Sequence, residues 1–166
     1  MELLIESMMK RRLETSTSSA SNHAAYLMLP GKNKCNFQSI AYYGENSCNV
    51  GNGSQHAEMN AVQKVSQFHS DKARKRNKKE YIMVVIRVSK DKTLLNSEIC
   101  KQCIHGIYCS SINTGIKIKK IYYSDVDGSI TKTTLKKLQM NENPFVSSFN
   151  RHCGYKSIYD KISNKK

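Results

Sequence analysis

The sequence of 166 residues has no run of about 18 apolar residues, so we expect no membrane-spanning helix and no association with a membrane. Residues 1–5 also do not resemble a secretory signal, because the apolar run is short, Glu2 is acidic and no basic segment comes first. We therefore expect a soluble protein in an intracellular, reducing setting. The length fits one domain that buries its own core, and we expect a single domain over residues 1–166.

A disulfide framework is not expected, although the chain has six cysteines, because disulfides are rare in a reducing setting. The cysteines are better explained as metal ligands or as small buried thiols. We interpret Cys35, Cys48 and Cys109 as buried thiols. The cysteines that we consider as metal ligands are Cys100, Cys103 and Cys153.

Acidic residues are few, with 13 Asp and Glu against 27 Lys and Arg, and the formal net charge is +14. A surface of this charge attracts polyanions, so phosphate groups and nucleic acid are natural partners. The alternative interpretation is an ordinary solvated surface that is rich in lysine. The densest basic run lies within residues 71–79. We expect a cytoplasmic protein, and the run at 72–79 makes a nuclear protein the alternative.

The first half of the chain predicts one helix followed by two paired strands. The apolar spacing within residues 2–14 predicts an N-terminal helix that packs on the core. Residues 24–29 and 37–43 have strand-like composition, and the turn residues at 30–33 lie between them. We therefore expect an antiparallel pair of strands.

The second half predicts the centre and one edge of a sheet. Residues 81–88 form a nearly continuous apolar run, which is typical of a central strand that is covered on both faces. Residues 116–123 and 129–135 are strand-like and are separated by a turn at 125–128. They predict a hairpin at the edge of the sheet.

A polar segment rich in glycine, residues 44–55, lies between the second predicted strand and a predicted helix. Such a loop is well placed to contact a substrate, although a plain connection is the alternative. We take Asn46, Asn52 and Ser54 as the candidate substrate-binding residues.

From Ser54 onward the pattern becomes helical, and Glu58 falls on the same stripe as the apolar residues Ala61, Val62 and Val65. A carboxylate on a buried stripe is costly unless it is paired or functional. Because His56 lies two residues earlier, we interpret Glu58 as functional.

Cys100 and Cys103 are three residues apart, in what should be the first turn of a helix. This spacing puts both thiols on one face, and the helix N-terminus favours thiolates. Together with His56 they supply three of the four ligands of a tetrahedral Zn²⁺ ion, and Glu58 remains unligated to handle protons. A lone Cys-x-x-Cys also occurs in redox motifs and structural zinc sites, so the specificity comes from its combination with His-x-Glu.

The strings His56-Ala57-Glu58-Met59-Asn60-Ala61-Val62 and Cys100-Lys101-Gln102-Cys103 resemble the signature of the zinc-dependent cytidine and deoxycytidylate deaminase superfamily. The order of expected elements over roughly residues 24–135 is similar too. The resemblance implies an α/β fold with three α-β-α layers, in which helices flank a mixed central sheet of about five strands. The N-terminal helix and a basic C-terminal tail, residues 141–166, lie outside it.

The resemblance implies that His56, Cys100 and Cys103 hold Zn²⁺ and that a water takes the fourth position, where its pKa falls from about 16 toward about 7. Glu58 is the implied catalytic residue, which takes a proton from the water and delivers protons to the base and to the departing ammonia. The implied reaction converts a cytosine-type base to uracil on cytidine, deoxycytidine or dCMP.

The chain departs from the family pattern in three places. Ile99 stands where proline is usual before the first cysteine. The segment 71–79 lengthens the spacing between the two motifs. The expected hairpin resembles the free-nucleoside branch, whereas the first string is closer to the deoxycytidylate branch.

A free nucleoside or nucleotide is the substrate that we favour, and we also expect a homo-oligomer. One alternative is a deaminase that acts on RNA or single-stranded DNA. Another is a catalytically inactive, zinc-stabilised module that binds nucleic acid. A third is a structural zinc site that is closed by His152 or Cys153.

Overall fold

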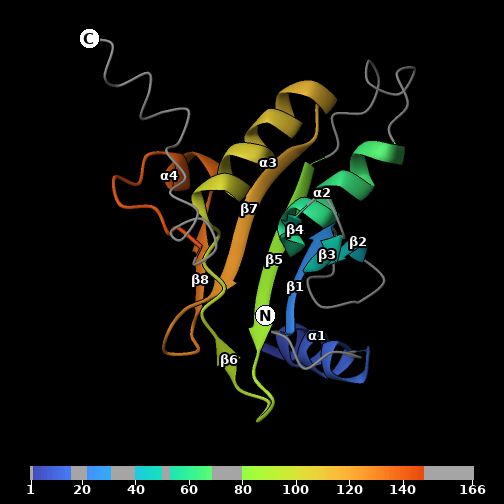
Figure 1. The fold of residues 1–166 in the computed structure, drawn as a ribbon, viewed down its shortest axis with the longest axis vertical. Helices are drawn as coiled ribbons and strands as arrows, with labels where there is room; N and C mark the ends of the chain where they lie inside the picture. The colour runs from blue at the N-terminus through green and yellow to red at the C-terminus, as the bar shows by residue number, and fades with distance from the viewer. Residues whose placement is uncertain (1, 16–21, 31–39, 50–52, 69–79, 148–166) are drawn as a thin grey trace.

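A computed structural model describes residues 2–15, 22–30, 40–49, 53–68 and 80–147 (Figure 1). The fold is α/β, with helices on both faces of an open mixed sheet. No helix in these ranges is long and apolar enough to cross a membrane. Outside the described residues lie Cys35, Asn52, the basic run at 71–79 and the tail that contains His152 and Cys153.

Four helices are interspersed with groups of strands in the described part of the chain. In chain order they are α1 (Glu2–Thr15), β1 (Asn22–Met28), β2 (Ile40–Glu45), β3 (Ser47–Asn49), β4 (Gly53–Gln55), α2 (Ala57–Phe68), β5 (Glu80–Val88), β6 (Leu94–Leu95), α3 (Lys101–Thr114), β7 (Lys117–Ser124), β8 (Ile130–Thr133) and α4 (Leu135–Gln139). The main sheet has six strands in the order β2-β1-β5-β7-β8, and β6 pairs with β5. These findings confirm the expected fold class.

Strand β5 is the centre of the sheet, as its apolar run predicts. It pairs antiparallel with β1 and parallel with β7. Its side chains alternate between two cores, because successive residues of a strand point to opposite faces. Tyr81, Met83 and Val85 pack with α2 and α3, whereas Val84 and Ile86 pack with α1.

Both predicted strand pairs are present. Strands β1 and β2 are antiparallel, and so are β7 and β8, which form the predicted edge hairpin. The last strand is shorter than expected, since it ends at Thr133 rather than at Leu135. The hydroxyl of Thr134 accepts a hydrogen bond from the backbone N–H of Lys137 at 3.3 Å, and this N-cap begins the short helix α4.

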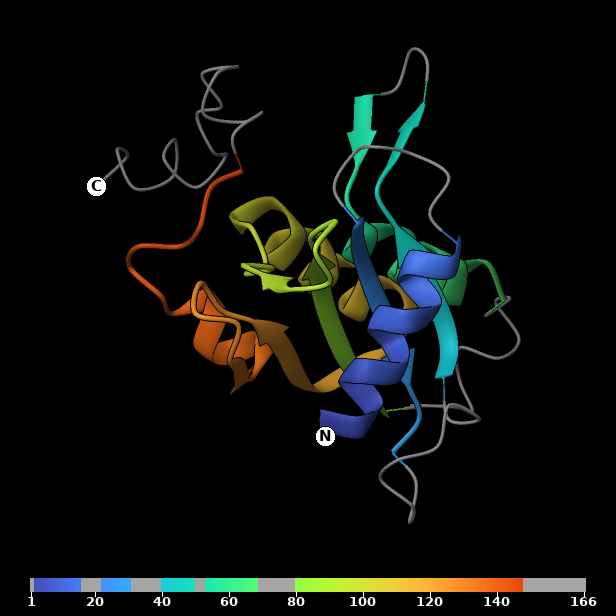
Figure 2. The same ribbon diagram turned by 90° about the horizontal axis from the view of Figure 1, so that it is seen from below.

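Helix α1 forms the outer layer on one face of the sheet, as expected (Figure 2). Leu4, Ile5 and Met8 are buried against apolar side chains of β1 and β5. Near the end of the helix, the buried guanidinium of Arg12 makes an ion pair with Glu45 of β2 at 2.8 Å. The helix is thereby fixed to both the centre and the edge of the sheet.

Helices α2 and α3 cover the opposite face, where they contact each other (Figure 1). Helix α2 approaches β2 so closely that a Cβ atom on Gly44 would overlap the backbone of Ala57 and Ala61. A glycine at this position of β2 therefore sets the depth at which α2 packs.

The polar segment before α2 is more regular than the loop that we expected. Gly44 and Glu45 belong to β2, and β3 and β4 pair as a separate antiparallel ribbon in which Ser47 lies opposite Gln55. The ribbon projects beyond the sheet (Figure 2). Helix α2 then begins at Ala57 rather than at Ser54, so His56 comes immediately before it.

We predict that Gly44→Ala lowers the free energy of unfolding by about 1–3 kcal/mol or more, because the added methyl group meets rigid backbone. The matched control is Gly106→Ala in α3, whose methyl group meets the flexible end of the Met59 side chain, with Sδ at 2.6 Å. A gain in helix propensity of about 1 kcal/mol offsets that contact. Urea denaturation of both variants measures the difference, and equal losses of stability would contradict the prediction.

Candidate metal centre

His56 is held at the N-terminus of α2. Its carbonyl accepts the first helical hydrogen bond, from the N–H of Asn60 at 3.0 Å. The next N–H, of Ala57, donates to Oδ1 of Asn46 at 2.9 Å. Asn46 was predicted to bind substrate, and the structure gives its side-chain oxygen a capping role at this helix. The bond fixes the backbone on which both His56 and Glu58 are carried.

Cys100 is the N-cap residue of α3, and Cys103 lies in the first turn, as predicted. The backbone of Cys100 is extended, with φ −71° and ψ 157°, and this geometry forms with isoleucine rather than proline at position 99. Ile99 is fully buried. The first N–H of the helix, at Lys101, donates to the carbonyl of Phe145 at 2.8 Å.

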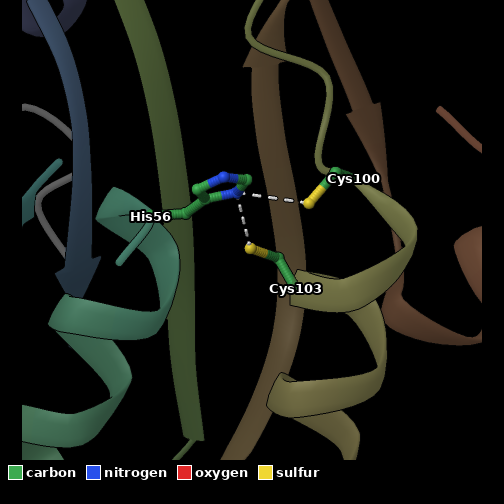
Figure 3. A group of neighbouring side chains, drawn as sticks. All are labelled: His56, Cys100 and Cys103. Atoms are coloured by element: carbon green, nitrogen blue, oxygen red, sulfur yellow. Dashed lines mark hydrogen bonds between the residues drawn. The ribbon is translucent and has the colours of Figure 1, made fainter. Parts of the chain in front are cut away.

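The three predicted ligands meet between the two helix N-termini (Figure 3). Nδ1 of His56 lies 3.3 Å from Sγ of Cys100 and 3.3 Å from Sγ of Cys103. A tetrahedral ion with zinc-like bond lengths would separate these atoms by about 3.6 Å. The three side chains are therefore close enough to hold one metal ion, and they offer the nitrogen and sulfur donors that such an ion prefers.

The two thiols are electrostatically unequal. A hydrogen bond from Cys103 is the main cause that lowers the pKa of the Cys100 thiol to about 4, and His56 adds to the effect. The same hydrogen bond and burial raise the pKa of the Cys103 thiol. His56 has a raised pKa, chiefly because it hydrogen-bonds to Cys100. The cluster thus concentrates negative charge on sulfur, which is what a cation requires.

Glu58 is only 1% exposed, and its Oε2 atom lies 3.9 Å from Sγ of Cys103. Burial raises the pKa of this carboxyl group to about 7. The residues around it on α2, Ala57, Ala61 and Val62, are buried and apolar, as the helical stripe predicted. The carboxyl group is therefore held beside the three candidate ligands.

His23 of β1 was not among the predicted site residues, although the charge of His56 affects its pKa. Its Nε2 atom is buried and has no hydrogen-bond partner among the residues that the structure describes. Burial, followed by the charge of His56, lowers the pKa of His23 to about 4. A signal was available, because His23 precedes Ala25 and Leu27 at strand spacing and these two residues are buried.

The other residues considered in the sequence lie elsewhere or cannot be placed. Cys109 contacts His105 on α3, with its Sγ atom 3.4 Å from Nε2. Ser54 belongs to β4 and Cys48 to β3, but their side chains are outside the described set. The structure therefore brings His56, Glu58, Cys100 and Cys103 together.

No protein-family model matches the chain, and no curated protein matches it either. The likeness to deaminases therefore depends on the two motifs. The structure itself establishes an α/β fold with a mixed sheet and a group of three side chains that can hold a metal ion.

We predict that Cys100→Ser and Cys103→Ser each weaken metal binding by more than about 100-fold, because removal of groups that only orient a ligand already costs about 10- to 100-fold. Cys109→Ser is the matched control and should bind metal as the wild type does, since Cys109 contacts His105 instead. Metal content and the absorption of the Co²⁺-loaded proteins measure binding. A Cys109→Ser variant as defective as the other two would contradict the assignment.

We also predict that the contribution of His23 to the free energy of unfolding decreases as the pH is lowered. The folded protein keeps this ring neutral down to about pH 4, whereas the unfolded chain protonates it near 6.5, so the stabilisation is lost as the pH falls between these values. The stability of the wild type relative to His23→Gln should decline by up to about 3 kcal/mol across this range. Chemical denaturation at several pH values tests this, and a constant difference would contradict it.

Proposed function

We propose that the protein is a zinc-dependent hydrolytic deaminase that converts a cytosine-type base to uracil on a free nucleoside or nucleotide, with release of ammonia. The observation that carries the proposal is the buried Glu58 carboxyl group beside His56, Cys100 and Cys103. A purely structural metal site has no use for a buried acid that is not a ligand, and burying one without a role is costly.

One histidine and two cysteines suit Zn²⁺, which would supply an activated water at its remaining position. The sequence places these ligands at the N-termini of α2 and α3, where the helix dipoles favour negatively charged groups. The residues around Glu58 are apolar, and such surroundings strengthen the electrostatic interactions of a buried carboxyl group.

Glu58 carries the proton transfers. It takes one proton from the water as the water oxygen bonds to C4 of the base, and it gives this proton to the ring nitrogen N3. It then moves the second proton of that oxygen to the exocyclic amine, and the C4–N bond breaks to release ammonia. The carboxylate is restored at the end, and the base leaves as uracil.

A deaminase that acts on RNA or single-stranded DNA is the second candidate. It is favoured by exposed lysines on the edge hairpin and the helix that follows it, because basic side chains bind phosphate backbones. These lysines are Lys117, Lys132, Lys136 and Lys137.

We predict that the zinc-loaded wild type releases ammonia from at least one of cytidine, deoxycytidine, dCMP and a cytosine-containing oligonucleotide. Glu58→Gln should retain zinc but lose activity by about 100- to 10,000-fold, because general acid–base catalysis contributes that much. Ammonia release and zinc content are measured on the same samples.

Equal ammonia release by wild type and Glu58→Gln would contradict the mechanism. Salt-sensitive binding of the oligonucleotide without any turnover would favour the inactive binding module instead. Zinc spectroscopy that detects four protein ligands would favour the closed structural site.

A further inference from the structure

His23 lies on the face of the sheet that carries the metal centre. In β1, Ala25 and Leu27 pack into the core below α2 and α3, whereas Ala24 and Tyr26 pack against α1. Side chains of a strand alternate between faces, so His23 projects to the same side as Ala25. It is the next position on this side toward the start of the strand.

The strand register brings His23 toward the N-terminal end of α2, which His56 precedes. Ala25 lies opposite Gly44, and Gly44 touches the backbone of Ala57 at the start of α2. One step further along this side of β1, His23 therefore reaches the level of the residue that precedes α2. The electrostatic effect of His56 on His23 agrees with this proximity.

The Nε2 atom of His23 needs a partner that the described chain does not supply. A buried polar atom that makes no hydrogen bond costs about 1–3 kcal/mol. A neutral imidazole offers one donor and one acceptor, so it can bind the polar edge of a heterocyclic base. The cost is recovered when such a ligand enters.

Arg87 lies on the same face of the sheet as His23. It is directly opposite His23 on β5, so both side chains project to the same face of the sheet. Arg87 is exposed, and it makes no ion pair with a carboxylate in the described part of the chain. A guanidinium beside a nucleoside site is suited to a phosphate group, which it binds with two parallel hydrogen bonds.

We propose that His23 and Arg87 determine the substrate of this site, with His23 hydrogen-bonding to the base and Arg87 binding the 5′-phosphate, so that the substrate class is a nucleoside monophosphate. The proposal rests on the proposed deaminase function and selects the nucleotide from the substrates that this function allows. The buried neutral imidazole is suited to the uncharged base, and the exposed guanidinium of Arg87 is suited to the charged phosphate.

Binding to zinc-loaded Glu58→Gln protein tests the proposal without turnover. Calorimetry with cytidine and CMP, and with deoxycytidine and dCMP, should show that the phosphate increases affinity. Adding Arg87→Gln should lower the affinity for the nucleotide by about 10- to 100-fold, as expected for a hydrogen bond to a charged group, and leave that for the nucleoside within about twofold. The matched control is Lys90→Gln, which removes an exposed cation three residues further on and should change neither.

His23→Phe should weaken nucleoside and nucleotide binding alike by about tenfold, and His23→Gln should restore part of the loss because its amide also donates and accepts. A measurement that needs no His23 variant is the ¹⁵N chemical shift of the His23 ring, which should move when nucleotide binds. An unmoved shift in the saturated complex would overturn the role of His23. Equal losses for nucleoside and nucleotide in Arg87→Gln would overturn the role of Arg87.

The proposed function and the roles of His23 and Arg87 are overturned by different outcomes. If the wild type neither binds nor deaminates any cytosine compound, the proposed function fails and this inference falls with it. If the wild type deaminates nucleosides and nucleotides equally and the His23 and Arg87 variants bind both normally, only the inference about these residues is overturned.

Discussion

The packing depth of α2 against β2 is the constraint on which the candidate site depends. Because Gly44 has no side chain, the backbone of α2 at Ala57 and Ala61 lies directly on the strand. His56 immediately precedes Ala57 and Glu58 lies between Ala57 and Ala61, so their positions relative to the sheet are fixed by backbone rather than by adjustable side chains. Helix α3 then needs only to present Cys100 and Cys103 at the same end of the sheet.

The parallel pairing of β5 and β7 explains why the two helices begin at the same end. A connection between parallel neighbours must cross the sheet, and α3 makes that crossing between β5 and β7. Its N-terminus consequently lies beyond the carboxyl end of β5. Helix α2 precedes β5 in the chain, and it contacts α3 on the same face of the sheet. Two positive helix ends therefore converge on one small volume, which favours thiolates and a carboxylate there.

Elements with strong local signals could be predicted from the sequence. The central strand followed from its apolar run, and the edge hairpin followed from two strand-like segments around a turn. His56, Glu58, Cys100 and Cys103 followed from spacing and from the cost of a buried carboxylate. Each of these inferences used residues that are close in sequence, where periodicity is informative.

The remaining features depend on contacts that no local pattern carries. The ribbon of β3 and β4 consists of short polar strands without apolar alternation, so it was expected to be a loop. Helix α4 has five residues and depends on the Thr134 cap. Strand spacing puts His23 on the same face as Ala25, but its position relative to α2 follows only from the register of β1 against Gly44. Tertiary pairing, rather than residue preference, determines all three.

The hydrogen bond from the Lys101 N–H to the Phe145 carbonyl joins a distant part of the chain to the helix that carries both cysteines. Since Lys101 follows Cys100 directly, the order of the segment after α4 and the order of the ligand-bearing turn are thermodynamically linked. Linkage of this kind is reciprocal. A molecule that bound near Phe145 and changed the order of that segment would therefore change metal affinity by the same factor by which metal changed its own affinity.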